Sequence, residues 1–395
     1  MQKQIPAQQP HPPALRSGRR SHLTLLALGA ALLILSGLAL VAFAPARSTV
    51  FAQQMPDGVP SIVGTKPLWS LSGATGWLNT PPLKAKELKG KVVLIDFWTY
   101  SCINCLRSMP YIEAWSKKYK NAGLVVIGVD TPEFGFEHKL DHVNLAIQKY
   151  GLTFPVALDA NYSIWNAFHN EFWPADYLIG PDGRVRYEHF GEGNYAEFEG
   201  LIQTLLRERD QSSENHASRS SRAAAVPAGV VSVLGHGAEA PGDFAQLDSP
   251  ETYIGYARAA RFVSPGGLRQ DAKHSYSLPA SLALNQWGLG GTWTDHPQVA
   301  VLDSPTGEIA FHFHARDLNL VLGPTKDGKP VRFRITIDGH APGADHGVDV
   351  DAQGNGVVRE YRLYQLVRQR DGVHDQTFRI EFLEPGVQAF SFTFG

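Results

Sequence analysis

Residues 92–105 read VVLIDFWTYSCINC and join an apolar run to a pair of cysteines. Only Asp96 interrupts the run, and continuous apolar character of this length is typical of a central strand. Cys102 and Cys105 follow directly, with two residues between them. We predict a strand, a short loop and a helix that begins at the cysteines, so that both thiols lie in the first helical turn.

The sequence around these residues alternates between strand and helix patterns from residue 64 to residue 208. Residues 124–129 form a second apolar run, which predicts a neighbouring strand. Residues 177–189 predict a hairpin, because two strand-like runs flank a Pro-Asp-Gly turn. Helices are predicted between the two apolar runs, near residues 138–149 and 162–169, and from Asn194 onward. These elements together predict an α/β domain.

Residues 250–395 show strand patterns only. In residues 331–338, for example, apolar residues alternate with charged or polar ones. Asp-Gly pairs at 327–328, 338–339 and 371–372 supply turns. Alternation of period two with one apolar face predicts an all-β domain, built as a sandwich or jelly roll. Residues 209–249, which begin with a run rich in Ser, Arg and Ala, predict a linker.

The N-terminal residues carry a pattern of membrane insertion. A basic tail, residues 1–22, precedes an uncharged apolar run, residues 23–44. At about 1.5 Å per residue this run can cross a hydrocarbon core of about 30 Å. Because the basic residues come first, we expect the N-terminus in the cytoplasm and the rest of the chain outside it. We expect a transmembrane anchor with a tether at residues 45–63, whereas cleavage of a signal segment near Ala52 would give a secreted chain.

The composition excludes several classes of protein. There are 36 Lys and Arg residues against 38 Asp and Glu, a net charge of −2, so no basic field predicts binding to nucleic acid. The chain has two cysteines, which excludes a secreted disulfide scaffold and a four-thiolate zinc site. We predict no metal and no cofactor beyond a redox-active disulfide between the two cysteines.

The position of the cysteines predicts reactivity. The beginning of a helix stabilises a thiolate through its free N–H groups and its dipole. Cys102 is therefore expected to be the exposed nucleophile and Cys105 the buried resolving thiol. Asp96, at the end of the preceding strand, is expected beneath them. Trp173-Pro174 precedes the hairpin and is expected to hold a cis peptide that faces the disulfide.

These residues strongly resemble the thioredoxin superfamily. The strand end Asp96-Phe97-Trp98, the CxxC pair, Pro110 and the Trp173-Pro174 dipeptide all fall at the family's positions. The resemblance implies a thioredoxin-like α/β fold for residues 64–208. It also implies a set of candidate catalytic residues, namely Cys102, Cys105, Asp96, Trp173 and Pro174. Trp98 and Pro110 are expected to support them structurally.

Further stretches narrow the resemblance. The insertion from Thr131 to Asn170 is similar to the TlpA-like branch. Residues 98–105 look closer to the extracytoplasmic region of DipZ-type thiol-disulfide proteins. Ser249–Gly255 and Phe392–Gly395 look like that family's C-terminal carbohydrate-binding-module-like domain. The resemblance therefore implies such a domain for residues 250–395.

The resemblance implies disulfide exchange with protein substrates, in the reducing direction. The Cys102 thiolate attacks the substrate disulfide, and Cys105 then attacks Cys102 and releases the reduced substrate. Asp96, whose pKa is expected to be raised by burial, accepts the proton of Cys105. Pro174 shapes a groove in which the backbone of Trp173 or Ala175 pairs with the substrate chain.

Two departures from the family bear on the partners. DipZ-type proteins often carry an electron-conducting membrane domain, whereas this chain has a single apolar segment. The electron donor is therefore expected to be a separate membrane protein of the CcdA/DsbD type. Many cytochrome-maturation relatives have Glu where this chain has Ser108, so the resemblance implies no narrow specificity for apocytochrome.

Two alternatives remain open at this stage. Thr99 and Cys102 match the Thr-x-x-Cys arrangement of a thiol peroxidase. Alternatively, the chain is a glycan- or protein-binding module with an accessory redox domain. In that case Trp287 and Trp293 would stack on sugars, although both are more simply interpreted as core residues of the sandwich.

Overall fold

The computed structural model describes residues 61–214 and 224–395. The predictions for the basic tail, the apolar run at 23–44 and most of the tether lie outside these residues. Within the described ranges, no helix is both long and apolar enough to cross a membrane.

The first domain is built on one six-stranded sheet. Its strands, in spatial order, are β1 (Gly76–Leu78), β4 (Val156–Leu158), β3 (Leu124–Asp130), β2 (Val92–Trp98), β5 (Ala175–Ile179) and β6 (Val185–Phe190). The central strand β2 runs parallel to β3 and antiparallel to β5. The two apolar runs and the hairpin predicted from the sequence are therefore confirmed.

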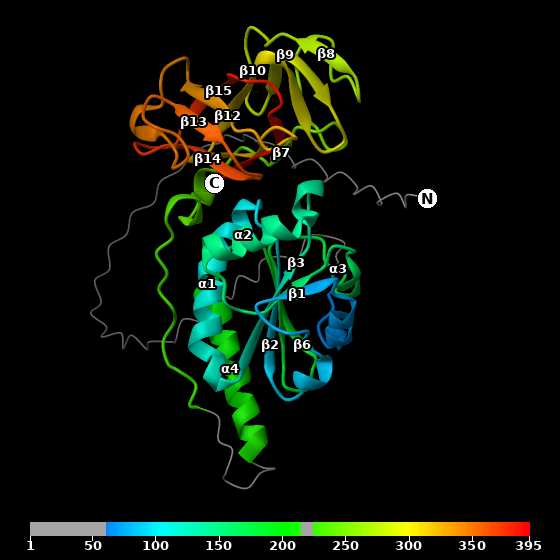
Figure 1. The fold of residues 1–395 in the computed structure, drawn as a ribbon. Coiled ribbons are helices and arrows are strands. Elements are labelled where there is room, and N and C mark those ends of the chain that lie inside the picture. Colours follow the sequence, from blue (N-terminus) through cyan, green and yellow to red (C-terminus); the bar gives the residue numbers. More distant parts are fainter. Residues whose placement is uncertain (1–60, 215–223) are drawn as a thin grey trace, which may run out of the picture. The chain divides into compact units, whose positions relative to one another are not determined.

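Four α-helices flank this sheet (Figure 1). They are α1 (Ile103–Tyr119), α2 (Leu140–Tyr150), α3 (Ser163–Ala167) and α4 (Tyr195–Glu214). Short 3-10 helices are η1 (Pro67–Gly73), η2 (Ala85–Glu87), η3 (Lys120–Ala122), η4 (Gly135–His138), η5 (Gly237–Glu239), η6 (Phe244–Gln246) and η7 (Gly343–Asp345). The helix predicted from Asn194 is α4, and it continues to Glu214.

Strand β2 is apolar apart from Asp96 because both of its faces are covered. Val92, Leu94 and Trp98 belong to a core shared with α1, α2 and α4. Their neighbours Val93 and Ile95 belong to a second core, which includes residues of α3 and η1. Because successive strand residues point to opposite faces, Asp96 faces the same side as Leu94 and Trp98, toward α1.

The second domain is all-β and antiparallel. Its strands are β7 (Thr252–Tyr253), β8 (Lys273–Tyr276), β9 (Trp287–Asp295), β10 (Ala300–His314), β11 (Asp317–Gly323), β12 (Val331–Ile337), β13 (Asn355–Val358), β14 (Arg362–Arg368), β15 (Asp375–Phe382) and β16 (Gln388–Phe394). Hydrogen bonds join all ten into one network, because the long strand β10 pairs with β9, β15 and β16.

The side chains of this domain follow the alternation read from the sequence. In β12, Val331, Phe333 and Ile335 are buried, whereas Arg332 and Arg334 between them are exposed. The glycines of the three Asp-Gly pairs all have positive φ, between 78° and 114°, as turns of this kind require. One apolar face therefore supplies the core of the domain.

The two domains share a hydrophobic cluster. Phe136, in η4 of the first domain, lies with its ring centroid 4.7 Å from that of Phe390 in β16. Val321 of β11 and Leu363 of β14 belong to the same buried cluster as the helices of the first domain. The second domain therefore covers apolar surface that the first domain would otherwise expose.

Candidate active site

The two cysteines lie where β2 gives way to α1. Cys102 is the N-cap residue of the helix, and its Sγ accepts a hydrogen bond of 3.5 Å from the backbone N–H of Cys105. Cys102 is partly exposed, whereas Cys105 is buried. Only the first thiol can therefore meet a macromolecular substrate directly.

The Trp173-Pro174 dipeptide faces the cysteines. Its peptide bond is cis, as the sequence predicts. The Sγ of Cys102 donates a hydrogen bond of 3.6 Å to the carbonyl oxygen of Trp173. The Trp173 side chain is fixed by a hydrogen bond of 3.0 Å from its Nε1 to the carbonyl of Thr131 and by contact with Trp165. A backbone edge thus lies directly beside the accessible thiol.

Asp96 is buried beneath the cysteine pair. Asp96 is 1% exposed, and neither of its carboxylate oxygens has a hydrogen-bond partner among the described residues. Burial, reinforced by the nearby charge of Asp176, raises the pKa of Asp96 well above its ordinary value. Burial also raises the pKa of the Cys105 thiol, and its neighbours Cys102 and Asp96 add to this effect.

Two ionisable residues beside Asp96 were not predicted from the sequence. Asp176 of β5 stands opposite Asp96, and His189 of β6 stands opposite Asp176. The Nδ1 atom of His189 is 3.6 Å from Oδ2 of Asp176. His189 ends the predicted hairpin and Asp176 directly precedes it, so the sequence places both beside that hairpin but does not show that they face Asp96.

The supporting residues lie in or beside the core. Trp98 is fully buried and packs against Gly128, where an added Cβ would lie 2.8 Å from Trp98 Nε1. Pro110 lies inside α1 and is partly buried. The hydroxyl of Ser108 donates a hydrogen bond of 3.0 Å to the carbonyl of Cys105. These positions fix the helix that carries the cysteines.

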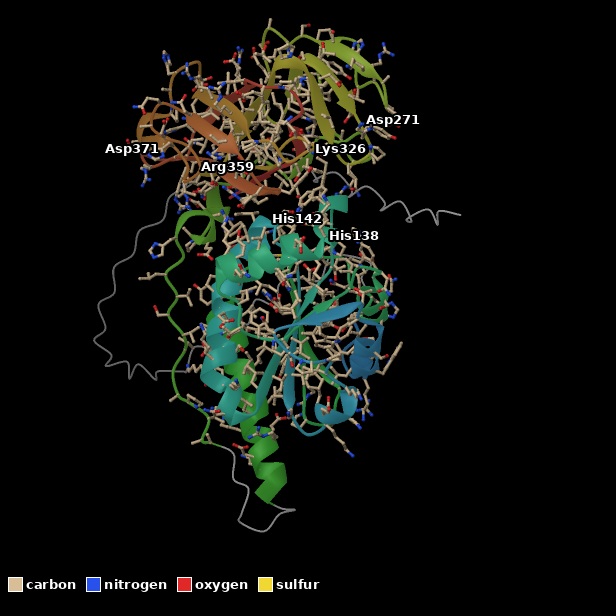
Figure 2. The ribbon with its side chains drawn as sticks, viewed as in Figure 1. His138, His142, Asp271, Lys326, Arg359 and Asp371 are labelled. Atoms are coloured by element: carbon tan, nitrogen blue, oxygen red, sulfur yellow. The ribbon has the colours of Figure 1, made fainter. Side chains whose placement is uncertain are left out.

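A buried carboxylate that the sequence analysis missed anchors the loop before the cysteines. Glu137 accepts a hydrogen bond of 2.5 Å from the hydroxyl of Ser101, and its other oxygen accepts the backbone N–H of Phe134 at 2.9 Å. Burial raises the pKa of Glu137 to about 7. In the same loop, the hydroxyl of Tyr100 lies 3.4 Å from Nδ1 of His142, which Figure 2 labels on α2.

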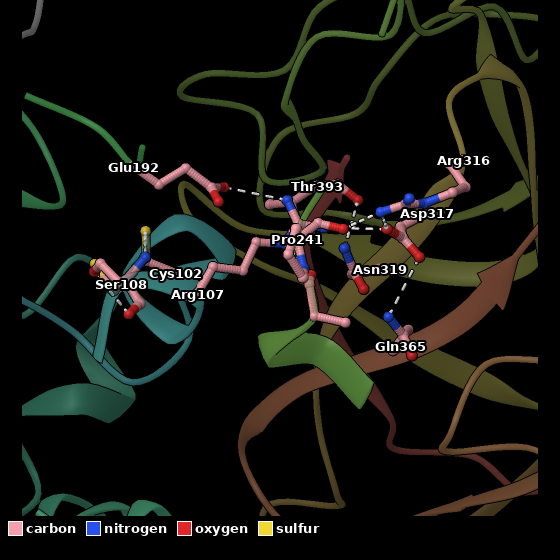
Figure 3. Close-up of polar contacts among 12 residues, drawn as sticks. Cys102, Arg107, Ser108, Glu192, Pro241, Arg316, Asp317, Asn319, Gln365 and Thr393 are labelled. Carbon is pink, nitrogen blue, oxygen red and sulfur yellow. Dashed lines mark hydrogen bonds and ion pairs between the residues drawn. The ribbon is translucent and has the colours of Figure 1, made fainter. Parts of the chain in front are cut away.

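Arg107 joins α1 to the second domain (Figure 3). Its guanidinium forms ion pairs with Glu192 at 3.2 Å and with Asp317 of β11 at 3.3 Å, and its Nε donates to the carbonyl of Ala240 at 3.1 Å. Asp317 also pairs with Arg368 of β14 at 3.1 Å. The side chains of Arg107, Glu192 and Asp317 are nearly inaccessible to solvent, so a buried carboxylate of the second domain, Asp317, helps to hold the cysteine helix.

The two tryptophans considered for sugar binding are core residues. Trp287 and Trp293 are both 0% exposed. Their indole N–H groups donate hydrogen bonds of 2.8 Å to the carbonyls of Ala260 and Gly290. Neither ring presents a face to solvent, so stacking of these two residues on a glycan is wrong.

Comparisons with known proteins agree with this division. The Redoxin family model matches residues 55–202, and the model described as Thioredoxin like C-terminal domain matches residues 249–395. Protein DipZ of Mycobacterium bovis is 35% identical over 348 residues, which cover 84% of this chain and 43% of DipZ. The chain therefore spans less than half the length of this relative.

Two further proteins match a smaller share of the chain. The thiol-disulfide oxidoreductase ResA of Bacillus thuringiensis is 32% identical over 128 residues, which cover 32% of this chain and 71% of ResA. The crystal structure of a thiol-disulfide isomerase from Corynebacterium glutamicum is 22% identical, with a TM-score of 0.32, and the match covers 38% of this chain and 98% of that one.

Proposed function

The chain belongs to the family of thioredoxin-like thiol-disulfide oxidoreductases, and on that premise we propose that it reduces disulfides in protein substrates through Cys102 and Cys105. The observation that carries this proposal is the pairing of an accessible thiol at a helix N-terminus with a buried thiol one turn further on.

The chemistry proceeds in two exchanges. The Cys102 thiolate attacks one sulfur of the substrate disulfide, a mixed disulfide forms, and the other substrate sulfur leaves as a thiolate. Cys105 then loses its proton and attacks Cys102, so that the second substrate thiolate leaves and a Cys102–Cys105 disulfide remains. The substrate gains two electrons, and an external dithiol must return the pair to its reduced form.

The geometry around the pair supports these roles. The carbonyl of Trp173, beside Sγ of Cys102, can accept a backbone hydrogen bond from an extended substrate segment. Asp96 lies beneath Cys105, and its unpartnered carboxylate is suited to receive the proton that Cys105 releases. Pro174 holds this backbone in place and carries no N–H that would compete for the substrate.

The test of this proposal uses the reduced full chain in detergent, a disulfide-bonded test protein and dithiothreitol. Reduction of the test protein faster than dithiothreitol alone achieves is the expected result. Consumption of hydrogen peroxide at a higher rate than reduction of the test protein would favour the thiol peroxidase instead.

A further prediction concerns Asp96 and stability. Because its folded-state pKa is raised above the ordinary value of 3.8, the native carboxyl keeps a proton that the unfolded chain releases. The contribution of this group to the free energy of unfolding is therefore fully present below pH 3.8 and is lost as the pH rises through the folded-state pKa.

Asp96→Asn keeps the shape of the side chain and removes its titration. We expect the variant to be more stable than the wild type at neutral pH and to lose less free energy of unfolding between pH 4 and pH 8. Urea unfolding at several pH values measures both. Parallel pH dependence in the two proteins would mean that Asp96 titrates normally.

We also propose that the chain is tethered to a membrane by residues 23–44, with both folded domains outside the cytoplasm. Basic residues before an uncharged apolar run support this orientation. A separate membrane protein of the CcdA/DsbD type would then supply electrons. Reporter fusions at the C-terminus test the proposal: alkaline phosphatase, which needs an oxidising compartment, should be active, and activity of a cytoplasm-only reporter would contradict it.

For the β domain we propose support of the cysteine helix together with docking of a protein or glycan partner. The buried ion pairs of Arg107 with Glu192 and Asp317 favour the first role. Any glycan contact would have to use residues other than Trp287 and Trp293, since both are buried.

A further inference from the structure

Three ionisable side chains stand in one row across the first sheet. Asp96 on β2 lies opposite Asp176 on β5, and Asp176 lies opposite His189 on β6. Residues directly opposite in neighbouring strands point to the same face of a sheet. The row therefore runs along the face that α1 and α4 cover, from the central strand under Cys105 to the edge strand β6.

The row keeps polar atoms unpaired inside the core. Both oxygens of Asp96, Oδ1 of Asp176 and Nε2 of His189 are buried without a hydrogen-bond partner among the described residues. Each such group costs about 1–3 kcal/mol of stability, and folded proteins keep few of them. Three neighbouring residues with this property indicate a role in chemistry, because packing alone would be better served by apolar side chains.

The charges of the row are linked. Two carboxylates on opposite positions of a buried sheet disfavour each other's ionised form, and the charge of Asp176 raises the pKa of Asp96. On the far side, His189 opposes the rise that burial causes in the pKa of Asp176. Asp96 in turn contributes to the raised pKa of Cys105.

Other groups also face the row. Helix α4 contributes Tyr195, whose pKa is raised by burial and then by Glu192, with a smaller effect of Asp176, and whose hydroxyl is buried and unpartnered. It also contributes Phe198, whose ring centroid is 5.8 Å from that of His189. Helix α1 contributes Cys105. In this set His189 pairs with Asp176, whereas Arg107 is paired with Glu192 and Asp317.

We infer that Asp96, Asp176 and His189 form one proton-carrying row, which takes up the proton of Cys105 and passes it to the edge of the sheet. This inference rests on the proposed function. When Cys105 attacks Cys102, the S–H bond of Cys105 breaks and its electron pair forms the new S–S bond. The bond between Cys102 and the substrate sulfur breaks, and that sulfur leaves as a thiolate. One oxygen of Asp96 gains that proton, a carboxyl proton moves on to Asp176, and Nδ1 of His189 receives it before release to solvent. Asp176 and His189 do not touch the cysteines and act as positioning residues.

The reaction of the reduced full chain with 5,5′-dithiobis(2-nitrobenzoate) separates the steps. The first equivalent of coloured thiolate reports the attack of Cys102, and the second reports the attack of Cys105 on the mixed disulfide. The second phase should rise with pH as the row loses its proton. Rates of both phases are measured by stopped flow from pH 5 to pH 9.

Asp176→Asn removes the neighbouring charge that raises the pKa of Asp96. The rising limb of the second phase should therefore move to lower pH by about one unit or more, while the first phase keeps its profile. His189→Ala should slow the second phase several-fold at neutral pH, and added imidazole should restore it. Asp295→Asn is the matched control, because Asp295 is a fully buried β9 carboxylate whose two oxygens also lack partners. It should change neither phase.

Second-phase profiles of Asp176→Asn and His189→Ala identical to that of the wild type would overturn the row, while the first phase would still support the proposed function. If the wild type shows no first phase, the proposed function fails, and carbon-13 titration of the Asp96 carboxyl in the wild type and in His189→Gln then tests the row by itself. Identical titration curves of the Asp96 carboxyl in the two proteins would overturn the proposed row. If Asp176→Asn does not fold, the same carbon-13 comparison of the wild type with His189→Gln replaces it as the test of the row.

Discussion

Cys102→Ser abolishes turnover of a protein disulfide, and Cys105→Ser leaves the first exchange intact but accumulates a mixed disulfide with the substrate. The difference follows from exposure, because Cys102 is accessible and Cys105 is buried behind it. A serine at 102 cannot provide a thiolate, whereas a serine at 105 removes only the group that resolves the intermediate.

Turnover with dithiothreitol and non-reducing electrophoresis with the test protein measure the two outcomes. Ser108→Ala, one helical turn after Cys105, is the control, since it removes a hydroxyl bound to the Cys105 carbonyl and no thiol. It should keep most of the turnover. Full turnover in Cys102→Ser would contradict the mechanism.

Arg107→Met lowers the free energy of unfolding by about 3–5 kcal/mol, because it leaves the carboxylates of Glu192 and Asp317 buried with one cation fewer. The guanidinium side chain is 1% exposed, so water cannot take over its ion pairs. We expect the loss to appear in urea unfolding of the full chain.

Arg332→Met is the matched control. Arg332 pairs with Glu384 at 2.5 Å, but its side chain is 68% exposed, so this substitution should cost at most about 1 kcal/mol. Equal losses in the two variants would mean that the Arg107 bridge contributes no more than a surface ion pair.

The sequence predicted the elements and the cysteine pair because both are local signals. Val92–Phe97 has apolar residues on both faces and only Asp96 as an exception, and the CxxC pair marks the beginning of the next helix. The alternation in β12 likewise depends on one strand and one core. The expectation that Asp96 lies beneath the cysteines is local in the same way, since it needs only the strand and the loop after it.

The features that were not predicted from the sequence all depend on contacts between residues far apart in the chain. Asp176 and His189 look like ordinary hairpin residues until the register of β2, β5 and β6 places them beside Asp96. Arg107 and Asp317 are 210 residues apart, and each reads alone as a surface charge. The shared core between the domains, with Phe136 against Phe390, has no local pattern at all. Two independent domains were therefore the simpler prediction.

The central claim is that Cys102 and Cys105 form a reversible redox couple. Equilibration of the full chain in detergent with defined ratios of reduced and oxidised dithiothreitol, followed by alkylation and mass spectrometry, measures it directly. We predict one two-electron transition in which both thiols disappear together and return together. Thiols that stay reduced at every ratio, or that oxidise only between molecules, would contradict the account.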